Sequence, residues 1–431
     1  MINLKDFIDN NSKYDTEAFQ KAIDLGSSRG GETVYVPFGT YTLATVILKD
    51  DTHIVVEDGV KIEAAPNISD FAADEPLEEI RYQDLSHSSY TCAMFYADNV
   101  KNVSVKGGAT INMHSNWDPN DSRASDGYHR GVKVFSLRKV EGLRLSDVKI
   151  LYATDISVLL GACKDVIVTG LYINSHIDGI SPDGCEDVVI SDCIIKTGDD
   201  ALVFKTSLFD GCVHHCQRIT VNNCIMSSRA NAIKFGTESA GDFKYINVSN
   251  CVVLNTQHSG IAIESADGAN IFGVNISNIT MCNVANPLFI YLSERMRAPD
   301  GTKMGSISDV NISNVYADVN DKRFKSIDSW YPDICEGSDH GVNRSYPSII
   351  MSTSKENKIK NLSLNNVNIK VLGGGKKDCE VFIPDKNAYP ECSNFKLNCY
   401  GVYVCNTENL KLDNVNFEAI TPDERVERII I

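Results

Sequence analysis

The sequence has no long apolar run. In 431 residues, no stretch approaches the roughly 18 apolar residues that a membrane-spanning helix needs. The first ten residues, Met1–Asn10, hold acidic and amide side chains where a signal peptide requires an apolar segment. We therefore expect a cytoplasmic protein that does not bind membranes.

Basic and aromatic residues are also scarce. The 41 Lys and Arg residues stand against 57 Asp and Glu residues, so the formal net charge is −16. Such an acidic chain is not built to neutralise phosphates, and we expect no nucleic-acid partner. Aromatic residues make up only 8 %, but hydrophobic residues reach 43 %, which excludes a disordered chain. At roughly 150 residues per domain, length alone suggests about three domains.

Cysteine is too sparse for a disulfide scaffold. The 14 cysteines are about 3 % of the chain, below the roughly 8–10 % of a small disulfide-rich protein. Cys212 and Cys216 flank His214 and His215, but a zinc site usually has a second ligand pair at matching spacing. We expect reduced structural cysteines, no metal site and no cofactor.

A short pattern of two apolar residues two positions apart recurs along the chain, and it overrides the domain count from length. The shortest spacings between repeats are 22 and 23 residues, the length of one coil of a stacked structure. Alternation of β-branched residues in such short runs predicts strands, and like strands at this period without helices between them predict a parallel β-helix. The repeats begin at Val103, Leu143, Val166, Val188, Ile219, Ile246, Val274, Val310, Leu362 and Leu410.

Polar residues at the strand ends and a helix at the N-terminus complete the predicted fold. Asn and Asp tolerate left-handed φ, which suits the tight turn after each strand, and Cys193, Cys224 and Cys251 follow in register as an inward-facing ladder. Residues 16–25 have helical spacing and predict a capping helix, with Asp15 as N-cap. We predict one domain over residues 1–431, with a cap to about 33, coils over about 34–420 and insertions near 113–130 and 320–346. The turn residues are Asp147, Asp192, Asn223, Asn250, Asn278, Asn314, Asn366 and Asn414.

Acidic residues concentrate at one position of two successive coils. Asp178 precedes Asp199 by 21 residues and Asp200 by 22, which is the length of one coil. Stacked coils lie about 4.8 Å apart, so the three carboxylates should face one another, and their repulsion should raise the pKa of at least one. A protonated acid beside an ionised base is what glycoside hydrolysis requires. Calcium binding by the same three carboxylates is the alternative.

These residues resemble the signature of the family 28 glycoside hydrolases, the polygalacturonase group. The match rests on Asp178-Gly-Ile, Gly198-Asp199-Asp200-Ala-Leu and the N-terminal segment from Phe7 to Tyr41. The resemblance implies an all-β, right-handed, single-stranded parallel β-helix and single-displacement, inverting hydrolysis. It implies that Asp199 is the general acid, and that Asp178 and Asp200 activate water.

The sequence departs from the family at three places around these carboxylates. The family's Asn-Thr-Asp is His176-Ile177-Asp178 here, its Gly-His-Gly falls on a segment where Asn231 replaces the histidine, and its Arg-Ile-Lys, which grips a uronate carboxylate, is Ala262-Ile263-Glu264. Other cations in register could substitute, or they could pair with nearby carboxylates instead. The candidate substrate-binding residues are His176, Lys205, Arg229, Asn231, Lys234, Glu238 and Glu264.

Two loops hold the only tryptophans, Trp117 and Trp330, whose rings could stack on a sugar or pin their own loops. The resulting hypothesis is an inverting hydrolase that cleaves an α-glycosidic bond in a pectin-related or other plant-derived oligo- or polysaccharide. A β-helix lyase or epimerase and a non-catalytic carbohydrate-binding solenoid stay open as alternatives.

Overall fold

The computed structural model describes residues 1–74, 85–114, 131–299, 301–319, 347–384, 389–393 and 395–431. Contacts divide the chain into unit 1, Met1–Thr197 with Leu208–His214, and unit 2, Gly198–Ser207 with His215–Ile431. Each unit is a stack of parallel strands, so the predicted parallel β-helix is confirmed. A single domain stays a prediction, and Trp117 and Trp330 with their loops lie outside the described residues.

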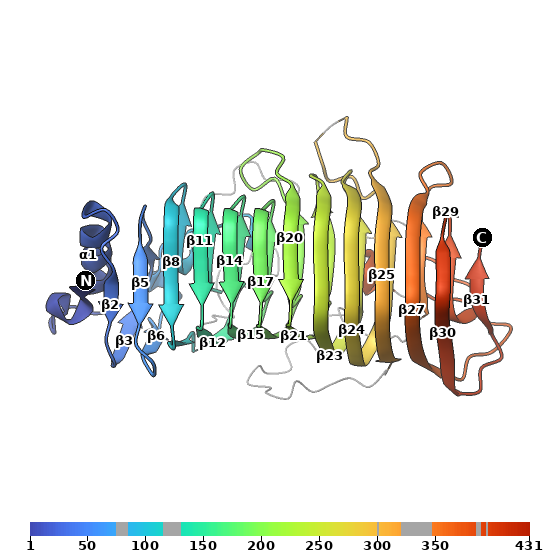
Figure 1. Cartoon of the computed structure of the whole chain (residues 1–431), viewed down its shortest axis with the longest axis horizontal. Helices are drawn as coiled ribbons and strands as arrows, with labels where there is room; N and C mark the ends of the chain where they lie inside the picture. Colours follow the sequence, from blue (N-terminus) through green and yellow to red (C-terminus); the bar gives the residue numbers. More distant parts are fainter. Residues whose placement is uncertain (75–84, 115–130, 300, 320–346, 385–388, 394) are drawn as a thin grey trace. The chain divides into compact units, whose positions relative to one another are not determined.

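In unit 1 each full coil contributes one short strand to each of three parallel columns. Leu143 pairs with Val166 and Val166 with Val188, so the predicted repeat of 22 to 23 residues is the coil itself. Figure 1 shows β8, β11, β14 and β17 of the first column side by side. The first column is β1 (Ile2–Asn3), β2 (Val34–Val36), β5 (His53–Val56), β8 (Lys101–Gly107), β11 (Glu141–Ser146), β14 (Lys164–Thr169) and β17 (Glu186–Ser191). The second is β3 (Thr40–Leu43), β6 (Lys61–Ala64), β9 (Thr110–Asn112), β12 (Lys149–Ala153), β15 (Tyr172–Ser175) and β18 (Ile194–Thr197). The third is β4 (Val46–Ile47), β7 (Ala93–Asp98), β10 (Lys133–Arg138), β13 (Val158–Gly161) and β16 (Ile180–Asp183).

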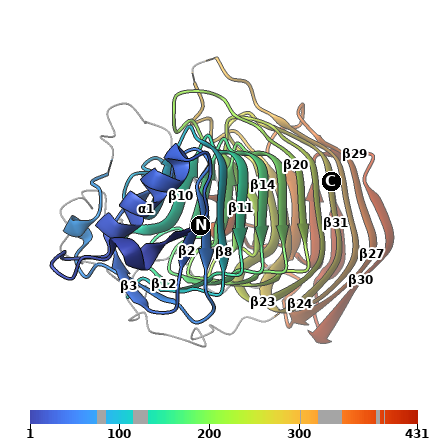
Figure 2. The same ribbon diagram turned by 60° about the vertical axis from the view of Figure 1, so that its left-hand side comes forward.

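The predicted helix is α1 (Thr16–Ser28), at the N-terminal end of unit 1 (Figure 2). Its apolar face, which includes Phe19 and Ile23, is buried, and it packs against β1, β2 and β4. The helix therefore covers the apolar end of the first coil, as a solenoid requires. Asp15 is the N-cap residue but makes no capping hydrogen bond, because its carboxylate accepts the backbone N–H of Thr42 at 2.8 Å.

In unit 2 the coils contain longer strands. β23 and β24 run for 23 residues each and pair with each other in parallel over most of that length. The unit consists of β19 (Leu202–Thr206), β20 (Cys216–Asn222), β21 (Ile225–Ser228), β22 (Ile233–Ser239), β23 (Phe243–Ser265), β24 (Asn270–Leu292), β25 (Ser306–Val319), β26 (Ser348–Ser352), β27 (Ile359–Gly373), β28 (Cys399–Cys405), β29 (Thr407–Glu408), β30 (Lys411–Thr421) and β31 (Val426–Ile430). Short 3₁₀ helices are η1 (Leu4–Phe7), η2 (Ile68–Asp70) and η3 (Leu85–His87) in unit 1, and η5 (Pro390–Cys392) in unit 2.

Every predicted turn residue has a left-handed backbone, with φ between 48° and 65°. In unit 2 the turn residues from Asn250 to Asn414 also form a ladder, since from Asn278 onward the amide of each one donates to the turn asparagine one coil before it. Asn278 donates to Asn250 at 2.9 Å, and Asn314 donates to Asn278 at 3.0 Å. Cys193, Cys224 and Cys251 are buried as predicted, and the cysteines whose side chains the structure describes are thiols. Among the described residues, no helix is long and apolar enough to cross a membrane.

Candidate active site

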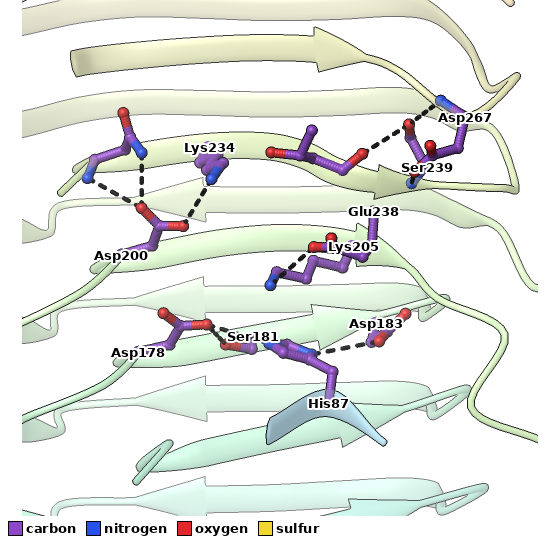
Figure 3. A network of polar contacts seen from close by, with 12 residues as sticks. His87, Asp178, Ser181, Asp183, Asp200, Lys205, Lys234, Glu238, Ser239 and Asp267 are labelled. Carbon is purple, nitrogen blue, oxygen red and sulfur yellow. Dashed lines mark hydrogen bonds and ion pairs between the residues drawn. The ribbon is translucent and has the colours of Figure 1, made fainter. Parts of the chain in front are cut away.

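In unit 1, Asp178 lies in the turn between β15 and β16, and its side chain is 4 % exposed. Its Oδ2 lies 3.2 Å from His87 Nε2 and accepts a hydrogen bond of 3.2 Å from Ser181 Oγ. His87 Nδ1 is 3.4 Å from Asp183 Oδ2, so the imidazole lies between two carboxylates (Figure 3). His87 is fully buried, and its contacts hold the Asp178 carboxylate in one orientation.

One coil earlier, Lys133 and Asp155 form a second buried group in unit 1. Lys133 Nζ lies 3.2 Å from Asp155 Oδ2, and both side chains are 2 % exposed or less. Burial lowers the pKa of Lys133, but the charges of Asp155 and Asp74 outweigh this effect and leave the pKa raised. Burial also raises the pKa of Asp155 against the opposing charge of Lys133. Sequence reasoning singled out neither residue.

In unit 2, Asp199 is exposed and Asp200 is buried beside it. Oδ1 of Asp200 accepts hydrogen bonds from the backbone N and the Nδ2 of Asn231, at 3.0 and 2.8 Å. Its Oδ2 lies 3.2 Å from Lys234 Nζ, so both oxygens have donors. The backbone N of Ser259 donates to Asn231 Oδ1 at 3.1 Å, which fixes the amide. Asn231 and Lys234, two candidate substrate-binding residues, thus both bind Asp200.

Lys234 also binds Glu391, which belongs to η5 and lies far away in the sequence. The distance from Nζ to Oε1 is 2.6 Å, and both side chains are buried. Burial opposes ionisation of Glu391, but the charge of Lys234 outweighs it and lowers the pKa of Glu391. Burial, followed by the charge of Glu391, raises the pKa of Glu264 well above its usual range. Burial and the neighbouring charge therefore favour the neutral form of the Glu264 carboxyl group.

A second ion-pair network in unit 2 contains Lys205 and Glu238. Lys205 Nζ lies 3.1 Å from Glu238 Oε2, and the other oxygen of Glu238 is 3.1 Å from Arg295 Nη1. Arg295 also forms a two-pronged pair with Asp267. Figure 3 shows Lys205 and Glu238 pointing toward each other, with Asp267 hydrogen-bonded to Ser239. Lys205 and Glu238 therefore satisfy each other's charge.

The two other candidates, Arg229 and His176, are both partly exposed. Arg229 is partly exposed, and in the described part of the chain no carboxylate lies within ion-pair distance of its guanidinium. His176 is partly exposed, and its backbone N donates to the carbonyl of Ala153 at 2.7 Å.

Sequence reasoning missed His87, Glu391, Arg295 and Asp267. His87 and Glu391 lie in short 3₁₀ helices outside the strand repeat, so spacing gave no signal for them. Asp267 follows the end of β23 in a Ser-Ala-Asp-Gly segment, and a turn of this type one coil after Glu238 could have indicated it.

Comparison with known proteins supports one family. The model of the family described as "Glycosyl hydrolases family 28" matches residues 27–339. A probable polygalacturonase from Vitis vinifera is 23 % identical over 268 residues, which are 59 % of this chain and 54 % of that protein. The chain therefore spans about half the length of this curated relative.

Two solved structures share the fold. The family 28 exopolygalacturonase of Yersinia enterocolitica superposes with a TM-score of 0.69 at 17 % identity, covering 99 % of this chain and 77 % of that one. The exopolygalacturonase of Thermotoga maritima gives 0.65 at 17 % identity, covering 86 % and 87 %. The fold is thus a right-handed parallel β-helix, as predicted. The chain belongs to family 28 of the glycosyl hydrolases.

Proposed function

We propose that this protein is an inverting glycoside hydrolase that cleaves an α-glycosidic bond in a pectin-related or other plant-derived oligo- or polysaccharide. The observation that carries the proposal is the pair of motifs Asp178-Gly and Gly198-Asp199-Asp200 in a chain of family 28. In unit 1, coils repeat every 22 residues at this level, as Val158 pairs with Ile180. Asp178 and Asp200 are separated by the same number, which supports a common position on successive coils.

In the proposed reaction Asp199 is the general acid. It is exposed, so its carboxyl group can reach the glycosidic oxygen and transfer its proton as the bond to the anomeric carbon breaks. Asp178 and Asp200 accept a proton from a water molecule, whose oxygen forms the new bond on the opposite face of the sugar. In an inverting enzyme the general acid and the general base are separated by roughly 6.5–9.5 Å to admit the water.

The contacts of Asp200 support its role as a base. Lys234 at 3.2 Å favours the carboxylate form, and Asn231 orients Oδ1 through two hydrogen bonds. His87 and Ser181 would orient Asp178 in the same way. Each base is thus held by neighbouring donors before substrate arrives.

The test is the Asp199→Asn variant. It should abolish hydrolysis of pectic oligosaccharides, followed by mass spectrometry, while the melting curve and sugar binding stay as in the wild type. Unchanged turnover would remove Asp199 from the mechanism. NMR of the fresh product should show the β-anomer from an α-linked substrate, since a single displacement inverts the anomeric carbon.

The same panel separates the alternatives. A lyase would leave an unsaturated, ultraviolet-absorbing sugar end and consume no water. A carbohydrate-binding solenoid without activity would bind oligosaccharides and release no new reducing ends.

A further inference from the structure

Lys234 forms ion pairs with two carboxylates of its own chain. Its ammonium lies 2.6 Å from Glu391 Oε1 and 3.2 Å from Asp200 Oδ2, and its side chain is 6 % exposed. Two carboxylates share this cation, so the three groups together carry a net negative charge. A substrate carboxylate brought to Lys234 would have to displace one of them or add a third negative charge.

The other buried cations described in unit 2 also form ion pairs with carboxylates of the chain. Lys205 pairs with Glu238, and Arg295 pairs with both Glu238 and Asp267. The buried side chains of these two ion-pair networks and Glu264 are three cations and five carboxyl groups. Even with Glu264 neutral, the four other carboxylates outnumber the three cations by one, so this buried wall repels a further carboxylate.

Glu264 supplies a buried polar group of a different kind. It is 1 % exposed and lies beside the Glu391 carboxyl group, which is the partner for its O–H when Glu264 is protonated. It also lies within the electrostatic reach of Asp200 and Lys234. Glu264 therefore offers no positive charge to a substrate carboxylate.

We propose that the sugar bound beside Asp200 is uncharged, because Asp200 and Glu391 together bind the ammonium group of Lys234. The inference rests on the proposed function and narrows its substrate class from pectin-related glycans to neutral sugar residues at this position. It assigns Glu391 the role of neutralising Lys234, which is then no longer available to a uronate carboxylate.

The inference concerns only this buried position. Arg229 and Arg297 are partly exposed and form no ion pair with the carboxylates described in unit 2. Arg297 lies over the ring of Tyr389, at 5.8 Å from its centre. Both side chains meet water, so they can accept charged groups at other positions along a longer substrate.

The experiment compares aryl α-glycosides on the full chain. Galactoside, rhamnoside and xyloside form the neutral set, and galacturonide is the charged counterpart. We expect kcat/KM for the best neutral glycoside to exceed that for the galacturonide about 100-fold, because the buried carboxylates repel a further desolvated negative charge. A galacturonide cleaved as well as or better than every neutral glycoside would overturn the inference, and would leave the hydrolase proposal intact.

A pair of matched variants tests the role of Glu391. Glu391→Gln removes one carboxylate from Lys234, so the preference for neutral glycosides should fall about tenfold. Glu408→Gln makes the same change at an exposed position, where the side chain is 51 % exposed, and should leave the preference unchanged. Melting curves establish that both variants fold. An unchanged preference in a folded Glu391→Gln protein contradicts the role given to Glu391.

If no glycoside is cleaved, the affinities of the free neutral sugars and of galacturonic acid, measured by calorimetry, test the inference instead. Tighter binding of galacturonic acid than of every neutral sugar, or no binding of any, overturns it. Neutral-sugar binding without turnover supports it and contradicts the proposed hydrolysis alone.

Discussion

At the scale of single residues, Glu264 couples the stability of the protein to pH. Burial and the charge of Glu391 raise its pKa well above the usual value near 4.5. Above about pH 5 the unfolded chain loses this proton while the folded chain keeps it, so stability falls with rising pH by about 1.4 kcal/mol per unit until the folded pKa is reached.

Glu264→Gln should remove this dependence, because the amide is neutral at every pH. Urea unfolding between about pH 5 and 9 should show that the free energy of unfolding of the variant increases relative to that of the wild type as pH rises. Glu408→Gln, at an exposed position, should give a curve parallel to the wild type. Parallel curves for Glu264→Gln as well would mean that Glu264 is ionised in the folded protein.

Which site residues could be predicted depended on whether the repeat contains them. Asp178 and Asp200 were indicated by a spacing of one coil, Lys234 by lying in register with them, and Asn231 by taking the place of a histidine in the family that the sequence resembles. Their pairing was open, because a lysine beside an aspartate can bind either substrate or the aspartate itself. His87 and Glu391 could not be predicted, since only folding brings their non-repeating segments to these carboxylates.

At the scale of elements, the asparagine ladder fixes the turns of unit 2. Asn278 has φ of 57°, donates to Asn250 and accepts from Asn314. Asn278→Ala loses both side-chain hydrogen bonds and places a Cβ in the left-handed region, so it should destabilise the protein by about 1–3 kcal/mol.

Asn278→Gly separates these two causes. Glycine accepts the positive φ, so this variant should lose only the contribution of the hydrogen bonds. Chemical denaturation should rank stability as wild type, then Asn278→Gly, then Asn278→Ala. An alanine variant as stable as the glycine variant would show that the backbone conformation contributes nothing here.

Secondary-structure elements could be predicted from the sequence where a single local preference determines them. The turn residues were predicted because Asn and Asp tolerate left-handed φ, and α1 was predicted from its apolar spacing. The hydrogen bond of Asp15 was not, because the backbone of Thr42 in β3 competes for the same carboxylate. The length of the 23-residue strands was not predicted. A turn at Asn250 was expected to separate two short strands, but β23 continues through this residue and pairs with β24 on both sides of it.

At the scale of the whole molecule, whose formal net charge is −16, calcium binding and acid–base catalysis predict opposite effects of a metal chelator on turnover. If Asp178, Asp199 and Asp200 transfer protons, EDTA should leave turnover and the melting temperature unchanged. Turnover lost with EDTA and restored by added Ca²⁺ would instead assign the three carboxylates to a metal.

The contact between Lys234 and Glu391 spans 157 residues of sequence, which has a consequence for biosynthesis. Translation adds roughly 5–20 residues per second, so on the order of ten seconds separates the synthesis of the two partners. A nascent or proteolytically shortened chain that ends before residue 391 has made Lys234 but not the carboxylate that neutralises it, and it also lacks β28 to β31. The charge of the buried wall is therefore set only when the last coils of unit 2 have been made.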